Sequence, residues 1–141
     1  MAEAEYSGTP LYRKLGIGED DEVLVVGADD EFTDHLGAML DDSNVLCTDP
    51  DDAPLFDVIV AFVESRSELL EELGRLRPKM APACGLWIAW PKKASKVPTD
   101  LTDNVIRDVA LPTGLVDNKV CAIDQTWSAL RLVIRRELRP R

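Results

Sequence analysis

Three short apolar runs restrict the fold of this chain more than any other feature. They cover residues 23–26, 56–63 and 86–90, and the first is closed by Gly27. Their residues are apolar at consecutive positions, whereas a strand with one solvated face alternates apolar and polar side chains. This pattern is typical of strands buried on both faces in the centre of a parallel sheet.

The segments between the runs have the periodicity of helices. Residues 32–40 place their apolar side chains on one helix face. Ser65 and Glu68 form a capping box that predicts the start of a leucine-rich helix, and we expect Pro78 and Pro82 to end it. Strands that alternate with helices over short connections indicate right-handed βαβ units.

The remaining elements complete the predicted sheet. We expect a short strand at residues 44–47, a helix at 101–110, and two strands at 119–123 and 129–134 that pair as an antiparallel hairpin. Residues 114–119 and 124–128 contain turn formers and are expected to form turns. The prediction is a three-layer Rossmann-like α/β domain over residues 1–141, with residues 1–21 as a lead-in segment. Its mixed, mostly parallel six-stranded sheet has the expected order 2-1-3-4-6-5.

The charge distribution bears on the partners. The chain has a net charge of −10, and residues 1–60 hold 16 acidic residues against Arg13 and Lys14. Nucleic acids and anionic membranes require a cationic footprint, so we expect neither as a partner. No apolar run reaches the ~20 residues that cross a bilayer, and the acidic N-terminus is unlike a signal peptide. We therefore expect a cytoplasmic protein.

Few residues point to catalysis or to a metal. Cys47, Cys84 and Cys121 lie far apart in apolar stretches and are interpreted as reduced, buried thiols. His35 is the single histidine, and we interpret it as a surface residue rather than a general base. There is no C-x-x-C motif, so no metal site is predicted.

The order of these segments resembles a known fold. FDVIVAFV, the capped helix and LRPKMAPACGLWIAWPKK resemble the fourth strand, helix and fifth strand of class I S-adenosylmethionine methyltransferases. KVCAID and ALRLVI resemble the closing antiparallel pair of the same fold. The resemblance spans residues 22–136 and implies a cofactor loop after the first strand. One strand of that fold, between its second and fourth, has no counterpart in this sequence.

The cofactor loop that this resemblance implies is incomplete. Such a loop is rich in glycine, so that its backbone approaches the cofactor closely. Here it reads GADDE, with Gly27 as its single glycine, and the three acids would repel the methionine carboxylate. Val25 stands where the fold has an acid. Asp49, after the second strand, matches the acid that binds ribose hydroxyls. Gly27 and Asp49 are thus the candidate cofactor-binding residues, but we expect no bound S-adenosylmethionine.

A second resemblance covers nearly the whole chain. YSGTPLYRKLGI, AWPKKASKVPTDLT and GLVDNKVCAIDQTWSALRLVIRRE are similar to a small bacterial family known only as a domain of unknown function. The match runs from Tyr6 to Glu137. It implies no particular activity.

A basic loop follows the run at residues 86–90. The loop concentrates cations and hydroxyls at the predicted carboxyl end of the sheet, where open α/β sheets bind ligands. We predict that it binds a small anionic ligand or an acidic protein partner; the alternative is a solvated loop that balances the acidic half of the chain. The residues are Lys92, Lys93, Ser95, Lys96 and Thr99.

Three functions remain open from the sequence. The first is a non-catalytic binding or regulatory domain with a methyltransferase-like fold, and this is the one we expect. The second is a small S-adenosylmethionine-dependent methyltransferase. The third is a structural module that self-associates, for example as a homodimer.

Overall fold

The computed structural model describes residues 15–17, 21–27, 45–46, 55–123 and 126–138. The described strands are β1 (Val23–Val26), β2 (Val45–Leu46), β3 (Phe56–Phe62), β4 (Met80–Pro91), β5 (Leu115–Ala122) and β6 (Trp127–Ile134). The described helices are α4 (Arg66–Leu76), α5 (Asp103–Ala110) and the 3-10 turns η1 (Arg77–Lys79), η2 (Lys93–Ser95), η3 (Leu111–Thr113) and η4 (Arg136–Leu138).

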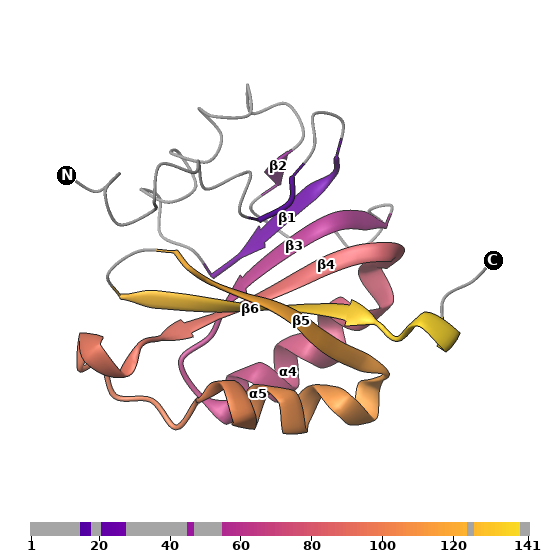
Figure 1. Cartoon of the computed structure of the whole chain (residues 1–141). Helices are drawn as coiled ribbons and strands as arrows, with labels where there is room; N and C mark the ends of the chain where they lie inside the picture. Colours follow the sequence, from indigo (N-terminus) through magenta and orange to yellow (C-terminus); the bar gives the residue numbers. More distant parts are fainter. Residues whose placement is uncertain (1–14, 18–20, 28–44, 47–54, 124–125, 139–141) are drawn as a thin grey trace.

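The strands form one mixed sheet (Figure 1) in the order β2-β1-β3-β4-β6-β5. β2, β1, β3 and β4 are parallel, while β6 pairs antiparallel with both β4 and β5. β2 contributes only two residues, and the five longer strands make up most of the sheet. The expected Rossmann-like α/β fold with a mixed sheet and a closing antiparallel hairpin is confirmed.

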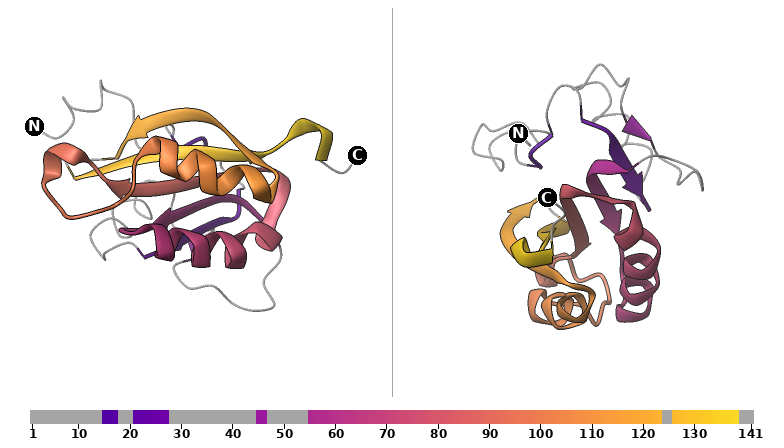
Figure 2. Two further views of the ribbon diagram at one scale, coloured as in Figure 1. Left: turned by 90° about the horizontal axis from the view of Figure 1, so that it is seen from below. Right: turned by 90° about the vertical axis from the view of Figure 1, so that its right-hand side faces the viewer.

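The sheet has an apolar core on each face. Figure 2 shows α4 and α5 side by side on one face, where Leu69, Leu73 and Ile106 are buried against the sheet. On the other face a second cluster includes Leu15 and Trp87. The second helical layer of the predicted three-layer arrangement would come from residues 32–40, which lie outside the described residues.

The strand β4 begins earlier than the sequence predicts. It starts at Met80 rather than at Leu86, and α4 ends at Leu76. Pro82, expected to end the helix, lies within the strand. It is tolerated because the pairing of β3 with β4 shifts register between Phe56 and Val58, and a residue without an N–H is accommodated at such an irregularity.

The strand β5 was also placed too late. Residues 115–118, expected in a turn, belong to β5, and the turn is confined to η3 and Gly114, which has a φ of 86°. The turn formers Asp117 and Asn118 lie where the pairing of β5 with β6 shifts register. A bulge accepts such residues within a strand. β6 likewise begins at Trp127 instead of Ala129.

A buried charge tests the central strands. Val25 and Ile59 are 1% and 0% exposed. We expect Val25→Asp or Ile59→Asp to prevent folding, because an unpaired buried charge costs several kcal/mol, which is of the order of the whole stability of a domain. Val120→Asp is the matched control, since Val120 lies on β5 and is 54% exposed. Dispersed NMR spectra and normal melting temperatures for the first two variants would contradict the burial of these strands.

Candidate functional site

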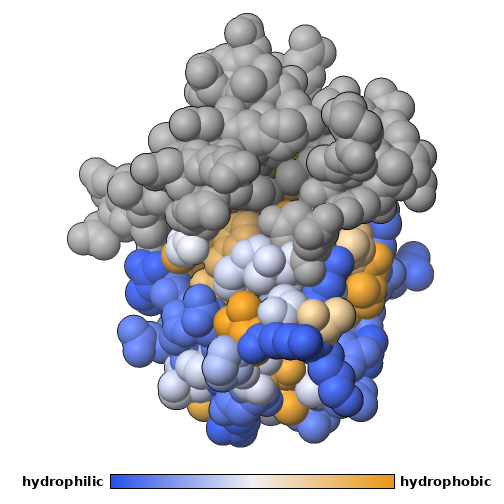
Figure 3. Space-filling view, turned by 90° about the vertical axis from the view of Figure 1, so that its left-hand side faces the viewer, coloured by the Kyte–Doolittle hydropathy of each residue, from blue (hydrophilic) through white to orange (hydrophobic). Residues whose placement is uncertain are grey.

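The carboxyl ends of the parallel strands meet at one edge of the sheet. Gly27 follows β1, Glu64 follows the end of β3, and Lys92 follows β4. Open α/β sheets bind ligands at this edge. Figure 3 looks toward the end of the molecule where β4 leads into η2, and its described surface is mostly hydrophilic with small separate apolar patches.

Gly27 is required by the packing of β1 against β3. Its φ is 77°, and a Cβ atom built on it would lie 2.8 Å from the carbonyl oxygen of Phe62. No side chain fits this approach without a backbone shift. The glycine that the sequence suggests for cofactor binding therefore has a structural reason of its own.

The connection from β3 to α4 is closed by its own side chains. The Glu68 backbone N–H donates to Ser65 Oγ at 3.2 Å, as the capping box predicts. The Glu68 carboxylate accepts from the Glu64 N–H at 3.0 Å, one residue before the cap. One amide before the cap and one in the first turn of α4, where an anion could bind, thus have partners within the chain.

A second connection locks onto the first. The Arg66 N–H donates to Asp100 Oδ1 at 2.8 Å. The Thr99 hydroxyl donates to the Glu64 carbonyl at 2.7 Å and accepts from the Leu101 N–H at 3.1 Å. The loop before α5 is therefore fastened to the loop before α4, and the predicted ligand-binding hydroxyl of Thr99 is engaged on both sides.

The basic loop forms a tight turn around η2. Lys92 is half-buried, whereas Lys93 and Lys96 are exposed. The Ser95 hydroxyl donates to the Lys92 carbonyl at 2.6 Å and accepts from the Val97 N–H at 3.2 Å. Lys96 has a φ of 64°, a left-handed conformation that is uncommon outside glycine. Ser95 thus shapes the turn, and binding by the three lysines stays a prediction.

The other candidates of the sequence fall outside the described residues. Asp49, His35, Cys47 and the acids at 29–31 belong to this group. Within the described ranges, no cluster of three or more histidine, cysteine, aspartate or glutamate side chains is placed to hold a metal ion. Among those residues there is also no helix of the length and apolarity needed to span a membrane.

Three amides at the described part of the edge already have partners within the chain. The amides of Glu64, Arg66 and Glu68 donate within the chain. The side chains that accept from the first two are the carboxylates of Glu68 and Asp100, which leave negative charge beside these amides.

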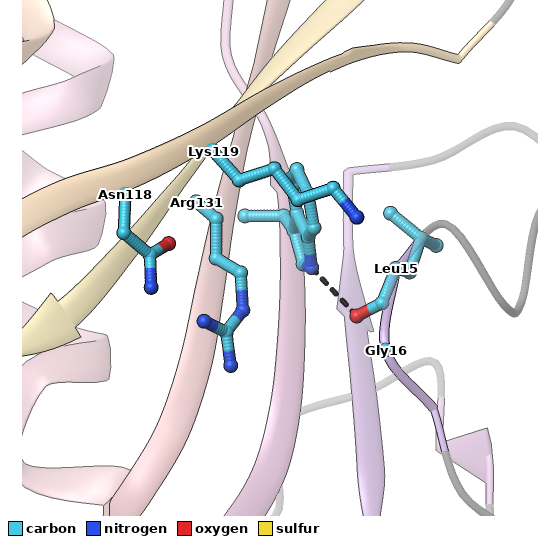
Figure 4. Close-up of a pocket in the computed structure, with 6 residues that line it drawn as sticks. Leu15, Gly16, Asn118, Lys119 and Arg131 are labelled. Carbon is cyan, nitrogen blue, oxygen red and sulfur yellow. Dashed lines mark hydrogen bonds between the residues drawn. The ribbon is translucent and has the colours of Figure 1, made fainter.

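A second site lies on the sheet face opposite α4 and α5. It is a cavity of about 190 Å³. Figure 4 shows Arg131 and Asn118 pointing the same way, while the Lys119 side chain extends toward the segment of Leu15. The Trp87 indole N–H donates to the Leu15 carbonyl at 2.9 Å and fastens that segment to the sheet. The lining residues are Leu15, Gly16, Trp87, Asn118, Lys119 and Arg131.

Arg131 was not among the candidate residues predicted from the sequence, although one signal was present. It is the one charged residue in the apolar strand ALRLVI. Arg131 is half-buried, and its guanidinium lies over Gly85: a Cβ on that glycine would be 2.5 Å from Nε and 3.0 Å from Cζ. A charged side chain inside an apolar run is a signal worth following, but the cavity itself is visible only in the fold.

Cys84 is an inert thiol next to this region. Burial, followed by the charge of Asp57, raises the pKa of the Cys84 thiol from 9.0 to about 12, against a smaller lowering by Arg131. The thiolate that acts as a nucleophile is therefore absent at neutral pH. The prediction of a buried thiol is confirmed for Cys84, whereas Cys121 is only half-buried.

Solved structures with a similar fold include S-adenosylmethionine-dependent methyltransferases. An S-adenosylmethionine-dependent methyltransferase from Aquifex aeolicus is 17% identical, with a TM-score of 0.55 over 88% of each chain. A TehB-like methyltransferase from Corynebacterium glutamicum is 10% identical, with a TM-score of 0.54 over 92% of this chain and 91% of that one. Fibrillarin from Aeropyrum pernix, solved with natively bound S-adenosyl-L-methionine, is 13% identical, with a TM-score of 0.53 over 82% and 67%. At these identities the likeness establishes a methyltransferase-like Rossmann fold.

The chain belongs to the family described as "Protein of unknown function (DUF3052)", which its sequence matches over residues 12–136. No curated protein matches the sequence. Both resemblances seen in the sequence, to that kind of family and to the methyltransferase fold, are confirmed.

A glycine series tests the contact between Gly27 and β3. We expect Gly27→Ala to destabilise by more than the about 1–3 kcal/mol of a residue forced to positive φ, because its Cβ also meets backbone. Gly16→Ala measures the backbone strain alone, since Gly16 has a φ of 76° and a Cβ atom added to it would have no other atom within 4 Å. Gly74→Ala, in α4 with open space, should stabilise by about 0.5–1 kcal/mol. Urea unfolding measures all three, and equal losses at positions 27 and 16 would refute a role for the contact.

The raised pKa of Cys84 makes two outcomes testable. At pH 8 iodoacetamide should modify Cys84 in the unfolded but not in the native protein, as read by peptide mass spectrometry. Above pH 9 the unfolded thiol ionises while the native one stays protonated up to about 12. The native state then binds more protons, so stability should fall across this interval. Cys84→Ala should fall less steeply; parallel stability curves would contradict the assignment.

Proposed function

We propose that this chain is a non-catalytic binding domain with a methyltransferase-like fold. The observation that supports it is the closure of the carboxyl edge, where Glu68 and Asp100 occupy the amides of Glu64 and Arg66. A ligand at this position would have to displace hydrogen bonds to carboxylates, which are about twice as strong as neutral ones. The displaced carboxylates would then stand unpaired beside the ligand.

The sequence after β1 also disfavours the cofactor that a similar structure binds. The fibrillarin structure holds S-adenosyl-L-methionine. To bind it, this chain would have to use the segment GADDE, in which three acids follow Gly27. Three consecutive acids would repel the methionine carboxylate of the cofactor, so this composition supports a domain without it.

The basic loop supplies a surface for a partner. Lys93 and Lys96 are exposed at the end of β4. Among the described residues, Lys92, Lys93 and Lys96 have no carboxylate within the 4.0 Å of an ion pair. We propose that this loop contacts an acidic partner. Such exposed charges give a weak attraction that salt screens over about 8 Å.

Calorimetry tests the absence of cofactor binding. We expect no saturable heat when S-adenosylmethionine or S-adenosylhomocysteine is titrated into the protein, because the edge offers acids and engaged amides. The melting temperature should also stay constant, since a ligand of the native state alone raises stability by RT ln(1 + [L]/Kd). A methyltransferase of the same fold serves as the positive control. Low-micromolar affinity would favour the enzyme instead.

A salt series tests the basic loop. Sulfate should raise the melting temperature of the wild type more than that of a Lys92→Ala, Lys93→Ala double variant, because the variant lacks two of the three cations. Chloride at equal ionic strength controls for screening. Equal shifts in both proteins would leave a solvated loop without a binding role.

A further inference from the structure

We propose that the cavity lined by Arg131 binds a small carboxylic acid, with the guanidinium as the anchor for its carboxylate. The site lies on the sheet face opposite α4 and α5, away from the carboxyl edge of the sheet. The inference goes beyond the proposed function and does not depend on it, because it concerns a different surface and a different ligand.

The strand register brings two cations together. Arg131 of β6 is the partner of Lys119 on β5 and of Trp87 on β4. Residues directly opposite in a sheet share one face, so both side chains lie on the face of the cavity. The Lys119 side chain extends toward the segment of Leu15, so Arg131 is the cation that would meet a carboxylate.

The backbone under Arg131 is shaped for its guanidinium. Gly85 is buried, and a side chain there would collide with Nε, Cζ and Nη2 of Arg131 at 2.5–3.0 Å. The arginine therefore lies flat against the sheet because position 85 has no side chain. Among the described residues, no carboxylate forms an ion pair or a hydrogen bond with Arg131. A half-buried guanidinium held in this way can donate two parallel N–H hydrogen bonds to the carboxylate of a ligand.

The walls of the cavity favour an organic acid over an inorganic ion. Leu15 and Trp87 line the cavity with apolar atoms, although the two side chains are only 1% and 0% exposed, and the Trp87 N–H is already used by the Leu15 carbonyl at 2.9 Å. Asn118 adds an amide on the side toward which Arg131 points. A hydrocarbon group would contact the apolar wall while its carboxylate meets Arg131.

The size of the cavity limits the ligand. Its volume is about 190 Å³, below the roughly 300–1,000 Å³ of pockets for drug-sized molecules. One water takes about 30 Å³ in the liquid, so the cavity accommodates a handful of heavy atoms. A short aliphatic or single-ring carboxylate fits, whereas a nucleotide does not.

NMR titration with butyrate, benzoate and inorganic phosphate tests the proposal on the full chain. We expect saturable shifts for the carboxylates at the amides of Gly85, Lys119 and Arg131 and at the Trp87 indole N–H. Phosphate should bind at least tenfold more weakly. Arg131→Gln should weaken carboxylate binding at least tenfold. Arg136→Gln is the matched control, because it removes an exposed arginine just beyond the same strand and should leave the affinity unchanged.

Gly85→Ala tests the position of the Arg131 guanidinium without changing its charge. It keeps every charge but places a Cβ where the guanidinium lies, so it should weaken binding much as Arg131→Gln does. If Arg131→Gln fails to fold, Gly85→Ala still tests the proposal, and the dispersion of its own NMR spectrum shows whether this variant is folded. No saturable binding, equal affinity for phosphate, shifts confined to residues 92–96, or unchanged affinity in the Gly85→Ala variant would each overturn the proposal. None of these results depends on whether S-adenosylmethionine binds, which the calorimetry reports separately.

Discussion

The burial of β3 is the constraint on which the rest of the structure depends. β3 pairs in parallel with β1 on one side and β4 on the other, and six of its seven residues are buried. Such a strand has no room for solvent on either face, so one face must be covered by α4 and α5 and the other by the cluster around Leu15 and Trp87. The connection that follows β3 is very short. After Val63 the chain has only Glu64 and Ser65 before α4 begins, so any binding site at the carboxyl edge must be formed by short connections.

The sequence predicts the centre of the sheet well because the signal there is local. A run such as VLVV is apolar at every position only if both faces are covered, and the capping box at Ser65 marks the next helix by a pattern four residues long. The boundaries of β4 and β5 were wrong for a physical reason. Pro82, Asp117 and Asn118 are turn formers in isolation, but register shifts in the sheet accept them within strands. Whether a turn former ends a strand or kinks it depends on the neighbouring strand, which the local sequence does not contain.

The candidate site shows the same division between local and non-local information. Ser95 and Thr99 were predicted to bind ligand, yet their hydroxyls bond to nearby or adjoining backbone. Serine and threonine in loops compete for backbone groups in this way, and a sequence pattern does not distinguish the two uses. Arg131 is the opposite case. Its meaning comes from Lys119, Trp87 and Gly85, which lie on three segments far apart in the chain and meet only through the pairing of β4, β5 and β6.

The amides before α4 and the Arg131 cavity have neighbours of opposite sign in a protein with a net charge of −10. At the carboxyl edge, Glu68 and Asp100 accept hydrogen bonds and remain acidic neighbours to any ligand. On the opposite face of the sheet from α4 and α5, Arg131 and Lys119 stand side by side. A half-buried guanidinium is screened much less than an exposed lysine. Local charge and burial therefore favour the Arg131 cavity over the amides before α4 as the site for a small carboxylate.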